Sequence, residues 1–166
     1  MLKAKHEFRP SNCYEILCTG GIKLDGIYNI YLSESNVPTR VYCEMKKGGW
    51  TRVLNRINRL NSSFDRVWTD YKEGFGDLTG NYWVGLKALQ QLTYQQQMSL
   101  RIDVASDDRD EEFIEYPSVL IYPEAQRFKM VLSPSNRGTL YDWMSTVHGG
   151  MPFYTKVNIN LLFSWL

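Results

Sequence analysis

Short runs of alternating apolar and polar residues fill the first third of the chain and predict β-strands. Residues 26–32 alternate in this way, and residues 40–45 and 50–54 continue the pattern. Turn-forming residues separate these runs, at 33–38 and again at 46–49. Because short turns between such runs favour neighbouring strands of opposite direction, we predict an antiparallel meander here.

The hydrophobic period changes in the middle of the chain and predicts a helix. Large apolar side chains recur at intervals of three and four residues, which places them on one helical face. They are Phe64, Val67, Trp68 and Tyr71. Ser63 or Asp65 suits the start of this helix, and Gly74 and Gly76 suit its end. A second, short helix is predicted at residues 86–92.

The second half of the chain returns to strand patterns. Strands are predicted at residues 99–104, 119–122 and 128–132. Helices that interrupt runs of strands without a regular β-α-β alternation indicate the α+β class.

Composition narrows the classes of protein that fit. The chain has 166 residues, which suits one domain, and its formal charge is +1. A charge this close to zero lacks the electrostatic footprint of a nucleic-acid binder, so no nucleic-acid partner is expected. The sequence has no apolar window of about 18 residues, so no membrane insertion is expected. The first residues lack the apolar core of a secretory signal.

The chain offers no recognisable catalytic or metal-binding motif. Its two histidines, His6 and His148, belong to no nucleophile elbow, HExxH helix or phosphate-binding loop. We therefore predict that the protein is not an enzyme and has no catalytic residues. The densest carboxylate run, at residues 107–112, lacks the glycine and the alternate spacing of a calcium loop. We predict a solvated acidic loop between strands, without a metal.

Basic residues gather between positions 40 and 59, where six of them stand against one acid, Glu44. The candidates for partner binding are Arg40, Lys46, Lys47, Arg52 and Arg56. Tyr42 and Trp50 lie between them, and such a mixture suits an anionic polymer such as a sulfated glycan. The simpler interpretation, which we favour, places these charges at the outward positions of half-buried strands.

Aromatic residues make up 14% of the chain and have two interpretations. They would serve either as a surface that stacks on carbohydrate or as packing residues, and their spacing favours packing. The residues concerned are Trp50, Trp68, Tyr71, Phe75, Tyr82 and Trp83. Asn61 begins an N-glycosylation triplet, which has meaning only if the protein is secreted.

Three cysteines leave two interpretations open. A disulfide between Cys13 and Cys43 would close a loop of about 30 residues, worth roughly 3.5 kcal/mol in the loop-entropy model. Cys18 would then remain without a partner. Three reduced, buried thiols in a cytosolic protein fit the spacing equally well.

Ordered motifs along the chain resemble a known family. They occupy residues 12–16, 26–30, 41–45, 48–51, 64–68, 71–76, 82–86, 92–93, 100–103 and, more weakly, 148–153 and 155–156. Together they resemble a fibrinogen-related domain, the C-terminal globe of fibrinogen chains, ficolins, tenascins, angiopoietins and microfibril-associated glycoproteins. The likeness covers residues 10–156, which leaves 1–9 as an N-terminal extension and 157–166 as an apolar tail outside the family pattern.

The resemblance implies a fold and a setting. The expected fold is α+β and fibrinogen C-terminal-like, with a small disulfide-stapled N-terminal subdomain and a central antiparallel sheet with short helices. The expected setting is extracellular, for a secreted protein. The resemblance also pairs Cys13 with Cys43 as the family's first disulfide. Cys18 has no counterpart in the family, so we expect it to stay free or to pair between chains.

The chain departs from the family near its end. Ile159 and Leu161 stand where the resemblance places calcium-ligating aspartates, and aliphatic side chains cannot bind calcium. We therefore expect no cofactor, because the family calcium site is not retained, and a C-terminal calcium and ligand-pocket subdomain that is largely missing. Residues 140–143 also depart from the family's glycine-rich turn.

These observations predict a non-enzymatic extracellular recognition module of lectin-like or innate-recognition type, whose usual pocket is lost. The expected ligand is an extracellular glycan or protein, and oligomers would depend on upstream segments that this sequence lacks. The alternative is a structural domain of the extracellular matrix or a receptor-interaction domain. It would bind through the basic group or through residues 103–115, which hold seven acids and one arginine. A third alternative is a truncated product without function.

Overall fold

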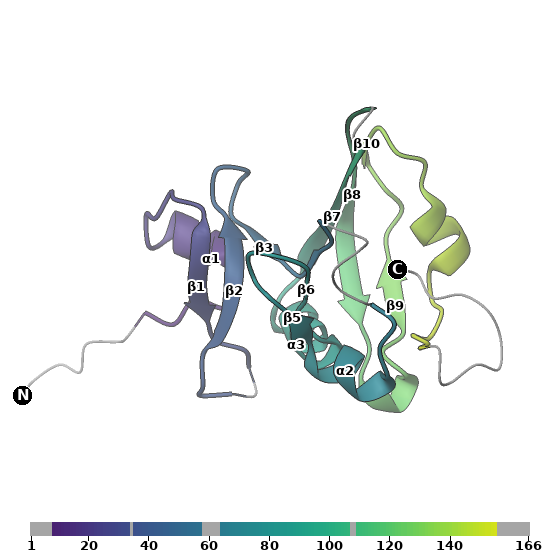
Figure 1. Ribbon diagram of the computed structural model, residues 1–166, viewed down its shortest axis with the longest axis horizontal. Helices are drawn as coiled ribbons and strands as arrows, with labels where there is room; N and C mark the ends of the chain where they lie inside the picture. The colour runs from purple at the N-terminus through teal and green to yellow at the C-terminus, as the bar shows by residue number, and fades with distance from the viewer. Residues whose placement is uncertain (1–7, 34, 58–63, 107–108, 156–166) are drawn as a thin grey trace, which may run out of the picture. The chain divides into compact units, whose positions relative to one another are not determined.

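The computed structural model describes residues 8–33, 35–57, 64–106 and 109–155 (Figure 1). The chain divides into two compact units. Unit 1 comprises Met1–Ser62 and Gly76–Val84, and unit 2 comprises Ser63–Phe75 and Gly85–Leu166. Among the described residues, no helix is long and apolar enough to cross a membrane.

Unit 1 contains the predicted antiparallel meander. Its strands are β1 (Gly26–Ile30), β2 (Thr39–Glu44) and β3 (Trp50–Arg52), in the order β1-β2-β3. A short helix, α1 (Cys13–Cys18), precedes them and was not predicted. Its start is fixed by Asn12, whose side chain accepts a hydrogen bond from the Glu15 N–H, while the Glu15 carboxylate accepts one from the Ser11 N–H. This arrangement is a variant of the capping box, in which the return bond comes from the residue before the N-cap Asn12.

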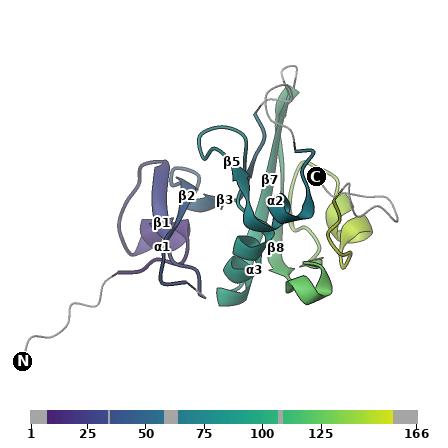
Figure 2. The same ribbon diagram turned by 60° about the horizontal axis from the view of Figure 1, so that its bottom comes forward.

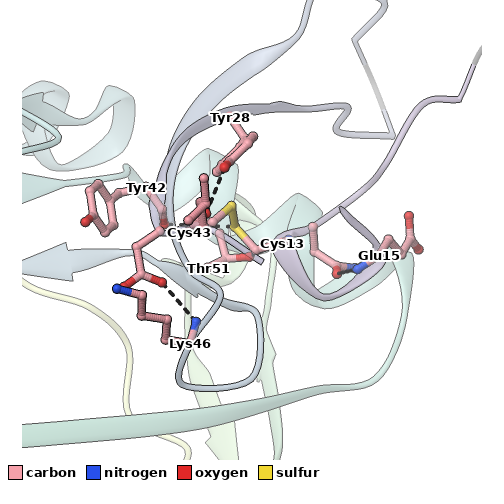
Figure 3. The surroundings of a disulfide bond; sticks show 10 residues. Cys13, Glu15, Tyr28, Tyr42, Cys43, Lys46 and Thr51 are labelled. Atoms are coloured by element: carbon pink, nitrogen blue, oxygen red, sulfur yellow. Dashed lines mark hydrogen bonds between the residues drawn. A yellow bond between two sulfur atoms is a disulfide. The ribbon is translucent and has the colours of Figure 1, made fainter. Parts of the chain in front are cut away.

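The disulfide predicted by the family resemblance is present. Cys13, at the start of α1, is bonded to Cys43 on β2, with 5.5 Å between their Cα atoms. Both residues are fully buried. The Cys13 N–H also donates to the Thr51 hydroxyl on β3, at 3.0 Å, so α1 is tied to two neighbouring strands (Figure 3).

The turn between β2 and β3 brings the chain close to α1. Gly49 has a φ of +81°, and a Cβ atom there would lie 3.0 Å from the Cα of Tyr14. A side chain at this position would therefore meet both backbone strain and a collision. Apolar residues of the strands and of α1 form the buried core of unit 1, which includes Ile16, Ile30, Leu32, Val41, Met45, Trp83 and Val84.

The strand predicted at residues 50–54 is divided in two. β3 ends at Arg52, and β4 (Leu54–Asn55) belongs to a second small sheet with β6 (Tyr82–Trp83) and β5 (Phe75–Gly76), in the order β4-β6-β5. Val53 lies between β3 and β4, and its carbonyl accepts a hydrogen bond from the Val84 N–H at 2.9 Å. The chain thus leaves one sheet and enters another within one residue.

Unit 2 is built on a longer antiparallel sheet. β7 (Met98–Ser106) and β8 (Arg109–Ile121) form its centre, and β9 (Met130–Leu132) and β10 (Arg137–Gly138) pair with β8. The three predicted strands of this region are present, although β8 begins ten residues earlier than predicted. The helix α3 (Leu86–Gln95) lies along β8, as Figure 2 shows, and is three residues longer than predicted.

The prediction of an acidic loop at residues 107–112 is wrong in part. Pairing of Ser106 with Arg109, and of Val104 with Glu112, places residues 109–112 within β8. Asp107 and Asp108 lie outside the described residues. Residues 109–112 join the sheet because their backbone groups pair with β7, and a strand can direct charged side chains outward.

The first predicted helix begins later than its hydrophobic period indicates. α2 (Trp68–Glu73) follows Val67, whose backbone is extended. Phe64 lies before the helix, but its ring contacts Phe75 at a centroid distance of 5.2 Å and its carbonyl accepts a hydrogen bond from the Tyr71 hydroxyl. Gly74 ends α2 with a φ of +100°, as predicted for that glycine.

Aromatic rings form much of the core of unit 2. Phe153 contacts Trp68 at 6.1 Å and Tyr71 at 5.2 Å, and Trp68 also contacts Phe128 at 5.9 Å. Phe128 and Phe153 are almost fully buried. Of the six aromatic residues weighed above as packing or stacking residues, Tyr71 and Trp83 are buried and the other four are half-buried, which favours the packing interpretation. Two short helical turns, Glu124–Gln126 and Met144–His148, complete the described elements.

Removing the disulfide should destabilise the protein. We expect Cys43→Ser to lower the free energy of unfolding by roughly 3.5 kcal/mol, because the unfolded chain regains the freedom of the open loop. Cys18→Ser is the matched control, because Cys18 is an exposed free thiol whose replacement should change stability by less than about 0.5 kcal/mol. Urea unfolding followed by tryptophan fluorescence measures both. Equal stability of the two variants would contradict the structural role of the disulfide.

Candidate interaction surfaces

The five basic candidates all lie in unit 1, but the structure does not gather them into one patch. Arg40 lies near the start of β2, whereas Lys46 and Lys47 lie in the turn after it. Four residue steps of β2 separate Arg40 from Glu44, which corresponds to about 13 Å, and Lys46 lies two residues further on, in the turn. Arg56 follows β4, which belongs to the other small sheet of the unit.

Arg52 is engaged by its neighbours on β2. Its guanidinium donates to the Glu44 carboxylate at 2.6 Å and lies over the Tyr42 ring, 4.2 Å from the centroid. Glu44 and Tyr42 lie on the same face of β2 because they are two residues apart in a strand. The charge of Arg52 is therefore largely compensated, and this side chain mainly orders the outer face of the β2–β3 pair.

Lys46 and Lys47 have the exposure that a binding site requires. Both are exposed, and the backbone of their turn is held at several points. The Lys46 N–H donates to the Asp25 carboxylate at 2.9 Å, and the Gly49 N–H donates to the Glu44 carbonyl at 3.0 Å. Two adjacent cationic side chains thus project from a backbone of defined shape.

On unit 2, one face of the β7–β8 pair carries a compact ion-pair network. Arg101 pairs with Asp103 at 2.7 Å and with Glu115 at 2.6 Å, and it lies over the Phe113 ring at 4.1 Å. Arg137 on β10 reaches the same Glu115 at 3.6 Å. These carboxylates have cationic partners, so this face is charged but nearly balanced.

A second feature of unit 2 is the carboxylate of Asp142, which organises the segment around it. It accepts hydrogen bonds from the N–H groups of Ser135 at 2.9 Å and Ser145 at 3.0 Å, and from the Ser145 and Tyr116 hydroxyls. Burial acts to raise the pKa of Asp142, but these hydrogen bonds outweigh it and lower the pKa to about 2. Burial, together with Asp142, raises the pKa of Tyr116 to about 12.

Two exposed aromatic residues flank Asp142, and sequence reasoning did not identify them as a site. Tyr141 and Trp143 are 70% and 62% exposed. Their rings contact each other at a centroid distance of 5.1 Å and an angle of 61°. The sequence feature that could have identified them is the departure of residues 140–143 from the family's glycine-rich turn.

Some predicted features fall outside the described residues. Asn61, the glycosylation candidate, is one of them, and so are Ile159 and Leu161 in the expected calcium segment. Cys18 is described, and it is a free and exposed thiol at the end of α1. Within the described ranges, no group of three or more histidine, cysteine, aspartate or glutamate side chains is arranged to hold a metal ion.

Comparison with known proteins identifies the family. The family model for the C-terminal globular domain of fibrinogen beta and gamma chains matches residues 9–159. Microfibril-associated glycoprotein 4 from Bos taurus is 35% identical over 153 residues, which cover 88% of this chain and 59% of the relative. Angiopoietin-1 from Bos taurus is 31% identical over 154 residues, which cover 92% of this chain and 31% of the relative.

Solved structures agree with the sequence relatives. The fibrinogen-like globe domain of human ANGPTL2 superposes with a TM-score of 0.83 at 30% identity, covering 89% of this chain and 68% of that one. A lamprey fibrin D-dimer in complex with the peptide Gly-His-Arg-Pro-amide gives a TM-score of 0.78 at 28% identity, covering 90% and 51%.

The chain belongs to the fibrinogen C-terminal domain family. The predicted fold class is therefore confirmed, and so is the prediction that the protein is not an enzyme, because the matched proteins are non-enzymatic binding modules. The relatives are secreted extracellular proteins. The chain spans 59% of the length of the microfibril-associated relative and about a third of the angiopoietin.

Asp142 should contribute to stability in a pH-dependent way. We expect Asp142→Asn to lower the free energy of unfolding at pH 7 by about 1–2 kcal/mol. An amide has one acceptor oxygen where the carboxylate has two, and its hydrogen bonds lack the strengthening effect of a negative charge. A carboxylate whose pKa falls from about 3.9 in the unfolded chain to about 2 in the folded one stabilises the fold above pH 4. This contribution is lost as the pH falls toward 2.

The two proteins should therefore converge in stability at acid pH. Urea unfolding at a series of pH values from 7 to 2 measures the difference. Asp70→Asn is the control, because Asp70 makes only a long surface ion pair with Arg66, at 3.9 Å, and should cost little. A difference for Asp142→Asn that stays constant down to pH 2 would refute the assignment.

Proposed function

We propose that this chain is an extracellular recognition module of lectin-like type that binds its ligand on the exposed surface of its strands and turns. The observation that carries this proposal is the pair Lys46 and Lys47, two exposed cations on a turn held by Asp25 and by the adjoining strands. A fixed backbone lowers the entropy lost on binding, because only the side chains remain to be ordered. The ligand that suits two adjacent cations is an anionic one, such as a sulfated glycan.

The proposal includes loss of the family's calcium-linked pocket. Its support is in the sequence, since Ile159 and Leu161 offer aliphatic groups where the family pattern has aspartates. Without carboxylate oxygens at these positions a calcium ion would lack part of its coordination shell. Recognition of acetylated or innate-immune targets by that pocket would then be lost, and surface recognition would remain.

The alternative function is a structural or receptor-interaction domain that binds a protein. The relatives support it, because they include microfibril-associated glycoprotein 4 and angiopoietins. The lamprey fibrin structure contains a bound peptide, which supports protein ligands for the family. The two functions differ in ligand class and are separated by the probes below.

Charge reversal at the turn should weaken binding to an anionic probe. We expect Lys46→Glu combined with Lys47→Glu to reduce the affinity for heparin by about tenfold, since each exposed ion pair contributes up to about 1 kcal/mol and reversal adds repulsion. The measurement is elution from a heparin column in a salt gradient. Arg9→Glu is the control, because Arg9 is exposed in the same unit but lies over the Tyr31 ring, beyond the opposite end of β1.

Elution of the double variant at the same salt concentration as the unchanged protein would exclude this turn as the binding site. A loss of about half that size in the Arg9→Glu variant, which changes the net charge by two units against four, would indicate that only the net charge matters. In either case the lectin-like proposal would give way to the protein-binding alternative.

Calcium should have no effect on ligand binding. We expect the chain to elute from heparin at the same salt concentration in calcium chloride and in EDTA, and to show no retention on an N-acetylglucosamine resin. The physical reason is the lack of carboxylates at Ile159 and Leu161. Retention on the acetylated resin that EDTA abolishes would contradict the loss of the pocket.

A further inference from the structure

The exposed aromatic pair of unit 2 has the properties of a recognition surface. Large exposed aromatic side chains in contact with each other are costly to leave in water and are enriched where proteins bind partners. Tyr141 and Trp143 are both mostly exposed, and their rings meet edge to face. The aromatic rings of the neighbouring cluster, by contrast, are half-buried or buried in the core.

Backbone and side-chain hydrogen bonds hold this pair in place. The Trp143 N–H donates to the Tyr141 carbonyl at 2.9 Å, and the preceding Leu140 N–H donates to the Phe113 carbonyl of β8 at 3.2 Å. Between the two aromatic residues, Asp142 is fixed by Ser135, Ser145 and Tyr116. Tyr116 is itself 1% exposed, so the anchor of the segment is a core side chain.

The charge around the pair is negative. Asp142 carries its negative charge at neutral pH, and its hydrogen bonds, which lower its pKa to about 2, keep it charged even in mild acid. β8 pairs regularly with β7 from Leu100 to Val104, so every second residue of β8 there lies on the same face of the sheet. Glu112 therefore lies on the same face as Tyr116, whose hydroxyl donates to Asp142. The partners of this face on β7 are apolar, and the cations Arg101 and Arg137 are paired with carboxylates on the opposite face.

We infer that Tyr141, Trp143, Asp142 and Glu112 form a docking surface for a basic segment of a partner protein. The face of an aromatic ring carries partial negative charge and attracts a lysine or arginine side chain, and tryptophan does so best. Because the two rings meet at an angle of 61°, a cationic side chain can contact both of them. The carboxylates of Asp142 and Glu112 add long-range attraction. Complementarity of charge therefore selects a cationic partner over a neutral or an anionic one.

This surface is distinct from the lysine turn of unit 1 and takes a ligand of opposite charge. It rests on the proposed function only in requiring an extracellular setting, because its protein ligand belongs to the alternative function. The two assignments can fail independently, because heparin is expected to bind to residues of unit 1 and the basic peptide to residues of unit 2.

The test uses a labelled seven-residue peptide, Gly-Arg-Gly-Arg-Gly-Arg-Gly, and a matched peptide in which citrulline replaces each arginine. Fluorescence anisotropy at 150 mM salt measures binding to the unchanged chain. We expect binding of the arginine peptide, and at least tenfold weaker binding of the citrulline peptide. Tyr141→Ala combined with Trp143→Ala should weaken binding of the arginine peptide about tenfold or more. Trp143→Phe should retain part of the affinity, because a ring remains.

Matched variants separate this surface from general acidity. Tyr14→Ala removes an equally exposed aromatic ring of unit 1 and should leave affinity unchanged. Glu112→Gln should weaken binding less than loss of both rings. Lys46→Glu combined with Lys47→Glu should not weaken binding. Because both aromatic residues are exposed, their replacement should not alter the thermal melting of the chain.

Three results would overturn the inference. Equal affinity for the citrulline peptide would show that no cation is recognised. Unchanged binding after loss of both rings would assign the peptide to the acidic strands alone. Concentration-dependent dimerisation in light scattering that loss of both rings abolishes would make the occupant a second copy of this chain and not a basic partner.

Discussion

The Cys13–Cys43 disulfide is the constraint on which the geometry of unit 1 depends. It joins the first turn of α1 to the end of β2, and the Cys13 N–H extends the link to Thr51 on β3. A sheet of three short strands buries little apolar area and gains only a modest hydrophobic stabilisation. A covalent link that restricts the unfolded chain supplies what the small core lacks. The turn with Lys46 and Lys47 begins two residues after Cys43, so the disulfide helps to fix the position of this turn.

In unit 2 the hydrogen-bonded carboxylate of Asp142 orders its surroundings as the disulfide does in unit 1. The segment of residues 133–151 has few long elements, and its strand β10 has only two residues. Asp142 connects this segment to itself through Ser135 and Ser145 and to the core through Tyr116. Hydrogen bonds to an ionised group are roughly twice as strong as those between neutral groups, so one carboxylate can order several residues. The aromatic residues on either side of Asp142 are positioned as a result.

Local patterns predicted the elements that depend on neighbours in sequence. The alternation at 26–32 and 40–45 gave the β1–β2 pair, and Gly74 marked the end of α2. The start of α2 was misplaced because Phe64 reaches the same aromatic cluster from an extended segment, which periodicity cannot distinguish from a helix. The helix α1 was missed although Ser11, Asn12 and Glu15 carry a capping signal. The disulfide required the family resemblance, since spacing left the cysteines undecided.

The candidate sites were harder to predict because exposure and pairing depend on tertiary structure. Arg52 looked equivalent to Lys46 and Lys47 in the sequence, yet Glu44 and Tyr42 engage it through strand register. Tyr141 and Trp143 stood out in the sequence only as part of a departure from the family's turn, and their exposure, in contrast to the buried ring of Phe153, required the structure. In both units, a backbone fixed by hydrogen bonds leaves a small number of large or charged side chains exposed to water. A surface of this kind needs no cavity to discriminate ligands, because its backbone is already ordered before binding and its charge disfavours ligands of like charge.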